Sequence, residues 1–92
     1  MAVEKVVYSD SGYSPASLEF KPGTKVVFVN DSDSPMWTAS DPHPIHSDFS
    51  SFDSRKSIGN GSEYEFTFTE AGTYSYHNHL SPEHKGTIIV TD

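Results

Sequence analysis

Short apolar runs that alternate with polar residues and end at turn signals constrain the fold of this chain most. The clearest run is 62–69, where Tyr64, Phe66 and Phe68 lie on one side and polar residues on the other. This period of two is typical of a strand that buries one face. Comparable runs are found at 3–8, 17–20, 25–30, 36–40, 73–78 and 87–91. No stretch longer than a turn has helical periodicity. About seven strands with turns between them predict an all-β domain, a β-sandwich, over residues 1–92.

The core of this sandwich is expected to draw on the aromatic and β-branched residues of the strands. The run KVVFVN at 25–30 is almost continuously apolar, which indicates burial on both faces of that strand. The residues expected to be largely buried are Phe20, Val27, Val29, Phe66, Phe68, Tyr74, Tyr76, Ile88 and Val90.

Composition excludes several functional classes. The 92 residues carry a net charge of −7, which argues against binding to nucleic acid or to anionic membrane surfaces. No apolar run approaches the roughly 20 residues that span a bilayer. The absence of cysteine excludes disulfides, thiolate chemistry and sulfur-ligated zinc. Met1 and Ala2 lead directly into the first expected strand, so we expect either a cytoplasmic chain or a domain expressed without its export segment.

The segment 41–60 has no strand pattern. It consists of about twenty residues rich in Pro, Ser and Asp, and so long a loop in a small domain is usually functional or disordered. Phe49, Phe52 and Ile58 can anchor it to the body of the domain, so we expect an ordered loop. It also carries two of the five histidines.

The other histidines cluster near the end of the chain. His77 and His79 are two apart on an expected strand, so both side chains leave the same face. Tyr74 and Tyr76 have the opposite parity, and large aromatic side chains normally face the core. The two histidines are therefore expected to point away from the core, where another part of the molecule must cover them to complete a metal site. A bulge at the strand end is the feature that could change this parity.

Two short-spaced pairs of histidines indicate a metal site. His43 and His46 are three apart in a proline-stiffened loop, a spacing that lets two imidazoles converge on one point. Imidazole is the commonest protein ligand for copper and zinc, and without thiols the Irving–Williams order favours Cu(II) over other divalent ions. We expect copper, with zinc as a substitute, at a site formed by His43, His46, His77 and His79. His84 is a weaker candidate, because a lone exposed histidine is usually a solvated surface residue.

Other polar and aromatic residues have simpler interpretations. Trp37 is expected to be a core residue. Asp41, Asp48 and Asp53 are expected to be solvated loop charges, although one of them could orient a ligating imidazole. No nucleophile elbow or suitably spaced acid supports a serine hydrolase.

The chain also resembles a known family. SPASLEFKPGTKVVFVNDSDSP, at 14–35, is similar to the N-terminal half of a cupredoxin, the copper-binding Greek-key β-sandwich. GTYSYHNHLSPEHKGTIIV, at 72–90, is similar to the C-terminal half. The resemblance implies a Greek-key sandwich of seven or eight strands, interrupted by the long loop at about 41–60. We expect a periplasmic or extracellular location, with the chain as an expressed domain without its signal peptide.

The ligands of a blue-copper cupredoxin are nevertheless missing. In that family the chain ends Tyr-x-Cys-x-x-His-x-x-Met-x-Gly, with Cys, His and Met as ligands. Alignment on the Tyr and Gly of this pattern places Asn78, Ser81 and His84 at the three ligand positions. The upstream histidine ligand falls near Met36. The resemblance therefore keeps the fold and excludes a thiolate-ligated copper.

The remaining motifs are similar to those of another branch of the superfamily. YHNHL, at 76–80, with GTIIV after it resembles the Tyr-His-x-His motif of multicopper oxidase domains. HPIH, at 43–46, resembles their His-Pro-x-His motif. In those enzymes such pairs bind a trinuclear copper cluster at the interface between domains. The resemblance implies that these imidazoles are copper ligands, His77, His79 and His46 first and His43 close behind them. Asp48 stands where a further histidine is expected, so one chain does not supply a complete oxidase site.

Two functions stay open at this point. The first is a copper-binding protein that stores or transfers Cu(II), with a redox or copper-delivery protein as its partner. The alternative is a copper-dependent oxidoreductase or a subunit of one, related to multicopper oxidase domains. A structural metal in a cell-surface sandwich is a third, weaker reading. We favour binding over catalysis and a monomer over an oligomer that shares the metal between subunits.

Overall fold

A computed structural model describes residues 2–41 and 51–92, and eight strands form in these two ranges. The strands are β1 (Val3–Ser9), β2 (Gly12–Ser14), β3 (Ser17–Phe20), β4 (Thr24–Asn30), β5 (Thr38–Ser40), β6 (Glu63–Phe68), β7 (Gly72–Asn78) and β8 (Ser81–Val90). No helix occurs among the described residues, which therefore contain none that could cross a membrane.

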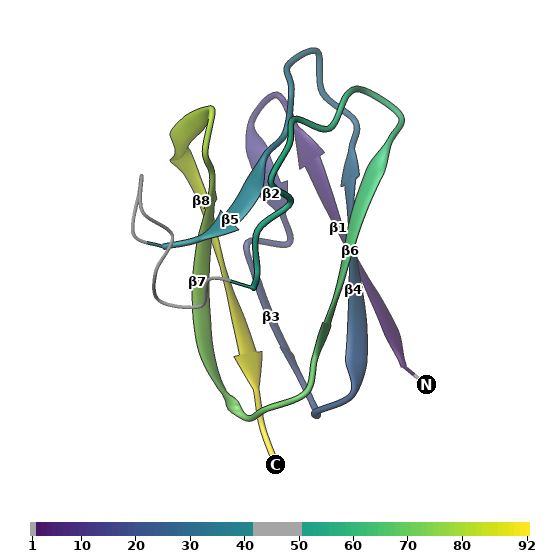
Figure 1. Cartoon of the computed structure of the whole chain (residues 1–92), viewed down its shortest axis with the longest axis vertical. Coiled ribbons are helices and arrows are strands. Elements are labelled where there is room, and N and C mark those ends of the chain that lie inside the picture. Colours follow the sequence, from purple (N-terminus) through teal and green to yellow (C-terminus); the bar gives the residue numbers. More distant parts are fainter. Residues whose placement is uncertain (1, 42–50) are drawn as a thin grey trace.

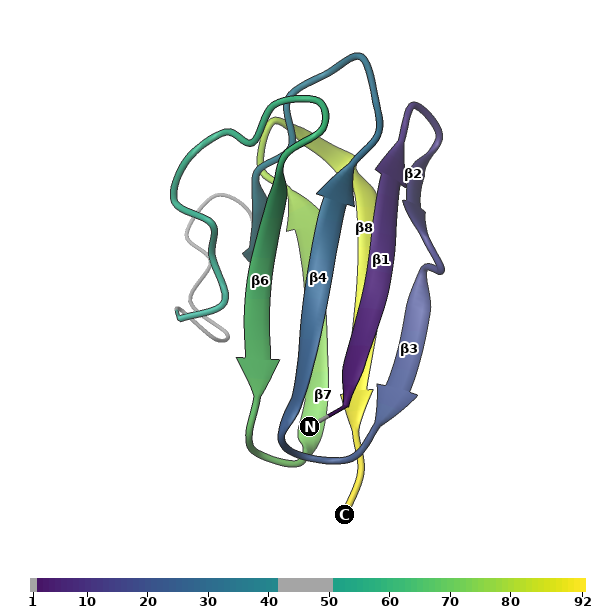
Figure 2. The ribbon, with the colours of Figure 1, turned by 90° about the vertical axis from the view of Figure 1, so that its right-hand side faces the viewer.

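Two four-stranded sheets face each other as a sandwich (Figures 1 and 2). The strand orders are β2-β1-β4-β6 and β3-β8-β7-β5. In the first sheet β1 runs parallel to β4, and in the second β3 runs parallel to β8, so the chain crosses repeatedly between the layers. The predicted all-β Greek-key sandwich of seven or eight strands is confirmed. β7 ends at the end of the sandwich opposite to both chain termini (Figure 1).

The burial of β4 corrects one sequence prediction. Its core-facing residues are Val26 and Phe28, each 0% exposed, whereas Val27 and Val29 are only half-buried on the other face. The physical reason is that a strand with valines at both parities has the same hydrophobicity on either side. The sequence therefore could not show which face meets the second sheet.

Most of the other core predictions are confirmed. Phe68, Tyr76, Ile88 and Val90 are buried. Phe20, Phe66 and Tyr74 are half-buried and pack around that core.

The long segment after β5 is tied to the body by the two described anchors. Phe52 is 0% exposed and Ile58 is 5% exposed. Ile58 also exchanges two backbone hydrogen bonds with Met36, of 2.7 and 2.9 Å. The third expected anchor, Phe49, lies outside the described residues. The segment from residue 51 onward is therefore ordered through its own side chains and backbone.

Gly86 on β8 leaves room for a core tyrosine. A Cβ at this position would overlap the phenol oxygen and ring carbons of Tyr76, which is completely buried. Because a packed ring cannot move aside freely, we expect Gly86→Ala to lower the free energy of unfolding by about 2–3 kcal/mol. Gly59→Ala is the matched control, since nothing lies within 4 Å of its Cβ, and should change stability by less than about 1 kcal/mol. Urea denaturation measures both, and equal effects would contradict the packing argument.

Candidate metal centre

β7 separates two kinds of side chain at its end. Tyr76 faces the core and packs edge-on against Tyr13 and Phe28, with ring centroids 4.9 and 5.4 Å apart. His77 has the opposite parity and lies on the outer face of the sheet. A register shift occurs between His77 and Asn78, the bulge that the sequence left open. Asn78 is nonetheless buried on the core side, so the two faces remain distinct.

His77 is buried although it lies on the outer face. Its side chain is 1% exposed, and its Nδ1 lies 2.6 Å from Oδ1 of Asp41. Asp41 follows directly after β5, the strand that pairs with β7, and this pairing brings the carboxylate to the ring. Asp41 was expected to be a solvated charge or a residue that orients an imidazole, and the geometry matches the second interpretation.

His79 lies against the indole ring of Trp37. The ring centroids are 4.9 Å apart, and the His79 amide donates a 2.7 Å hydrogen bond to the Trp37 carbonyl. Trp37 is half-buried, and its Nε1 donates to Oδ1 of Asp53 at 2.8 Å. The expectation that Trp37 belongs to the core is wrong. The sequence could not reveal this, because an aromatic residue at a strand edge has no local signal for the face that it covers.

The residues around His77 share one face of the sheet. Ala39 pairs with His77 on one side and with Asp53 on the other, and directly opposed residues project to the same side. Two imidazoles and two aspartates are thus gathered at this edge. Among the described residues no three His, Asp or Glu side chains are placed to hold a metal ion together. His43 and His46, the other predicted ligands, lie outside the described residues, as does Asp48.

Behind this face, Asn78 is the centre of a hydrogen-bond network. Its Oδ1 accepts from the amides of Trp37 and Leu80, at 2.9 and 3.0 Å. Its Nδ2 donates to the Tyr8 hydroxyl at 2.8 Å and to the Pro35 carbonyl at 3.1 Å. One side chain therefore connects β1, the turn before β5 and the turn after β7. We call the side chains of Tyr8, Asn78 and His84 the interior network.

His84 belongs to this interior network. Its Nδ1 lies 2.7 Å from the Tyr8 hydroxyl, and the ring is half-buried on β8. The expectation of a solvated surface histidine is therefore wrong. The reason is that β8 begins at Ser81, so His84 stands on a strand and not in the loop that the sequence predicted.

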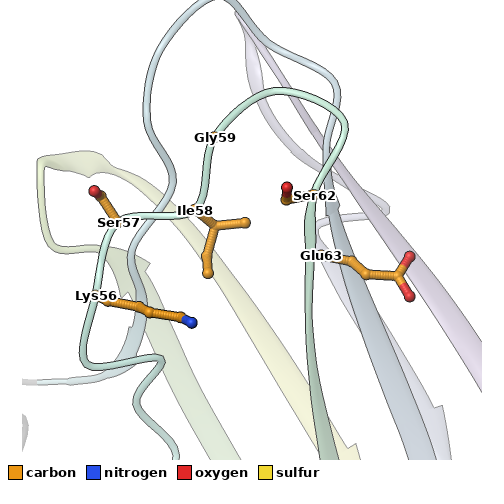
Figure 3. A pocket seen from close by; sticks show the side chains of 6 residues that line it. All are labelled: Lys56, Ser57, Ile58, Gly59, Ser62 and Glu63. Atoms are coloured by element: carbon orange, nitrogen blue, oxygen red, sulfur yellow. The ribbon is translucent and has the colours of Figure 1, made fainter.

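A groove on the surface of the described residues lies elsewhere. It has a volume of about 500 Å³ and occupies the approach to β6 (Figure 3). Its lining residues are Lys56, Ser57, Ile58, Gly59, Ser62 and Glu63. It contains no histidine and is not part of the candidate metal centre.

Comparisons with known proteins agree with this architecture. The family model of the cupredoxin-like domain matches residues 1–90, so the chain belongs to the cupredoxin-like family. A solved structure described as a novel purple cupredoxin from Nitrosopumilus maritimus is 24% identical, with a TM-score of 0.82, and the match covers 96% of this chain and 99% of that one. Amicyanin from Paracoccus versutus is 26% identical, with a TM-score of 0.80, over 97% of this chain and 81% of its own. A search of curated protein sequences finds no match.

Two residues of the interior network lie at positions that hold copper ligands in the blue-copper pattern. In the sequence resemblance, Asn78 and His84 stand at two ligand positions of a blue-copper centre. In this structure both are hydrogen-bonded to Tyr8, and the chain has no cysteine. Met36, near the upstream ligand position, is buried with 0% exposure. The donor set at these positions contains no thiolate and only one imidazole, so it does not fit a blue-copper ion.

Proposed function

We propose that this cupredoxin-like domain binds Cu(II) through histidine imidazoles on the outer face of β7, for storage or transfer of the ion. The observation that carries the proposal is the 2.6 Å contact between His77 Nδ1 and the Asp41 carboxylate. A carboxylate on one ring nitrogen is the usual partner of a metal-ligating histidine, because it fixes the tautomer and the orientation of the ring.

The contact makes Nε2 the proposed ligand atom of His77. When Nδ1–H donates to Asp41, the neutral ring presents its lone pair at Nε2. His79 follows directly after the last residue of β7 and would supply the second imidazole. Nitrogen ligands without sulfur favour Cu(II) among the divalent first-row ions. Bound copper would be a Lewis acid and a one-electron redox centre at this face.

Two imidazoles under-coordinate a copper ion, so further ligands are required. We propose His46 and His43 for this role, because both belong to the segment that begins immediately after Asp41. One chain then contains all four imidazoles, and the site needs no second subunit.

The proposal predicts that copper quenches the fluorescence of Trp37, the single tryptophan of the chain, whose ring lies 4.9 Å from that of His79. Titration with Cu(II) should show saturable quenching at one ion per chain. His77→Ala, His79→Ala and His46→Ala should each weaken binding about 100-fold, and Asp41→Asn about 10-fold. His84→Ala is the control and should leave the affinity nearly unchanged, because His84 contacts Tyr8 and not the outer face.

Equal and small effects of all five substitutions would contradict the proposal and indicate adventitious surface binding. Mass measurement in solution with and without copper tests the intrachain site. A mass that stays that of one chain supports it, whereas copper-dependent dimers would show that subunits share the ion. In a parallel titration with Zn(II), the same variants should bind zinc more weakly than the wild-type protein does.

A further inference from the structure

The hydrogen bonds that Asn78 makes in the interior network have a defined direction. Two backbone amides, of Trp37 and Leu80, donate to one atom of the Asn78 side chain, which must therefore be the oxygen. The other atom is then the nitrogen, and it donates to the Tyr8 hydroxyl. The Tyr8 oxygen is an acceptor in this bond, so its own proton is free to point elsewhere.

His84 is the other polar group at the Tyr8 oxygen. The Tyr8 oxygen and His84 Nδ1 are 2.7 Å apart, a short distance for a phenol that donates to an imidazole. In the tautomer that has its proton on Nε2, His84 Nδ1 accepts this hydrogen bond. The ring packs over Gly12, where a Cβ would lie 3.5 Å from His84 Cδ2. The phenol and its base are thus held together before any reaction occurs.

Tyr8 is one of three buried tyrosines in contact, and among the described residues it is the only one of the three whose phenol contacts a base. Its ring is 4.8 Å from that of Tyr13, which is 4.9 Å from that of Tyr76. The Tyr13 hydroxyl is paired with the Thr38 hydroxyl. The Tyr76 hydroxyl has no hydrogen-bond partner among the described residues. Burial raises the pKa of Tyr13 and of Tyr76, so both keep their protons.

We propose that Tyr8 is a redox-active tyrosine with His84 as its proton acceptor. A one-electron oxidant takes one electron from the Tyr8 ring, and the O–H bond breaks as the proton moves to His84 Nδ1. The products are a neutral tyrosyl radical, an imidazolium and the reduced oxidant. A one-electron reductant, such as a small-molecule thiol, returns an electron to the Tyr8 ring, and the proton moves back from His84 Nδ1 to the phenol oxygen. The Asn78 amide remains hydrogen-bonded to that oxygen throughout.

Because the Tyr8–His84 pair is inside the sandwich, it could accept oxidising equivalents from other residues and hold them. Tyr8 is 1% exposed, so solutes cannot make direct contact with its ring. A phenol without a base would lose its electron less readily, because the phenol cation radical is a very strong acid that has to release its proton. Oxidation that begins anywhere in the tyrosine cluster should therefore come to rest on Tyr8. The proposal does not depend on the copper site, because it uses only residues of the interior network.

The test is one-electron oxidation of the metal-free protein by laser-generated ruthenium(III) tris(bipyridine), with electron paramagnetic resonance of the frozen product. Wild type should give a neutral tyrosyl radical whose formation is slower in deuterium oxide. Loss of a positioned proton acceptor in His84→Phe should slow formation by about 100-fold. Tyr8→Phe should remove the isotope-sensitive radical. Tyr74→Phe is the control, because the Tyr74 hydroxyl donates to the Glu70 carbonyl at 2.7 Å, and should leave it unchanged.

A radical confined to Trp37 or Tyr74, or a wild-type rate without an isotope effect, would overturn the proposal. The isotope effect is measured on the unaltered protein, so it decides the question even if a variant folds poorly. Near-ultraviolet circular dichroism of each variant verifies that the aromatic core is intact.

Discussion

Replacing Asn78 by alanine is expected to lower the free energy of unfolding by about 3–5 kcal/mol. The substitution removes the Asn78 partner of the amides of Trp37 and Leu80 and of the Pro35 carbonyl, and one of the two partners of the Tyr8 hydroxyl. Asn78 is 0% exposed, and water cannot take its place without opening the end of the sandwich. In a domain of this size such a loss is a large part of the total stability. Urea denaturation followed by tyrosine and tryptophan fluorescence measures it.

Asn60→Ala is the matched control for this prediction. Asn60 is exposed, and its Nδ2 donates a single hydrogen bond of 2.9 Å to the Ser32 carbonyl. Its loss should cost no more than about 1 kcal/mol. Similar losses for Asn60→Ala and Asn78→Ala would mean that Asn78 does not hold the turns together.

Phe52→Ala is expected to destabilise the domain by about 3–5 kcal/mol. The ring is 0% exposed and meets five other aromatic rings between the two sheets. Those rings are Phe28, Tyr64, Phe66, Phe68 and Tyr76. Removing Phe52 leaves a cavity at the point where the segment after β5 is anchored. Thermal or urea unfolding should therefore show a markedly lower midpoint.

Phe20→Ala is the control that distinguishes the anchoring effect of Phe52 from a general loss of buried aromatic surface. Phe20 is half-buried at the other end of the core and packs against Phe68 with a centroid distance of 5.8 Å. Its removal should cost about half as much, since a half-buried side chain loses less transfer free energy. Phe20→Ala should also leave copper binding unchanged. An effect of Phe52→Ala smaller than that of Phe20→Ala would contradict the anchoring role.

The fold could be predicted from local patterns because its strands carry strong signals. The alternation of 62–69 correctly predicted which side of β6 faces the core, and the parity of β7 correctly separated Tyr76 from His77. The buried face of β4 could not be predicted in this way, since valines occur at both parities of the strand. β8 was predicted too short because Pro82 and the charged residues at its start are typical of a loop.

The candidate site could be predicted only where its residues are close in sequence. His77 and His79 were predicted as ligands from their spacing, and an Asp41 that orients an imidazole was among the alternatives. The interior network has no such signal. Tyr8 is 70 residues from Asn78 and 76 from His84, so only the packing of the two sheets brings them together. A tyrosine near the end of β1 looks like any other core aromatic in the sequence.

Electron paramagnetic resonance of the copper-loaded protein tests the central claim most directly. The account predicts one Cu(II) per chain with nitrogen hyperfine structure and a pale solution without the intense thiolate band, since the chain has no cysteine. The double variant with His77→Ala and His79→Ala should lose this spectrum. A spectrum without nitrogen coupling, or one that the double variant retains, would show that copper does not bind on the outer face of β7.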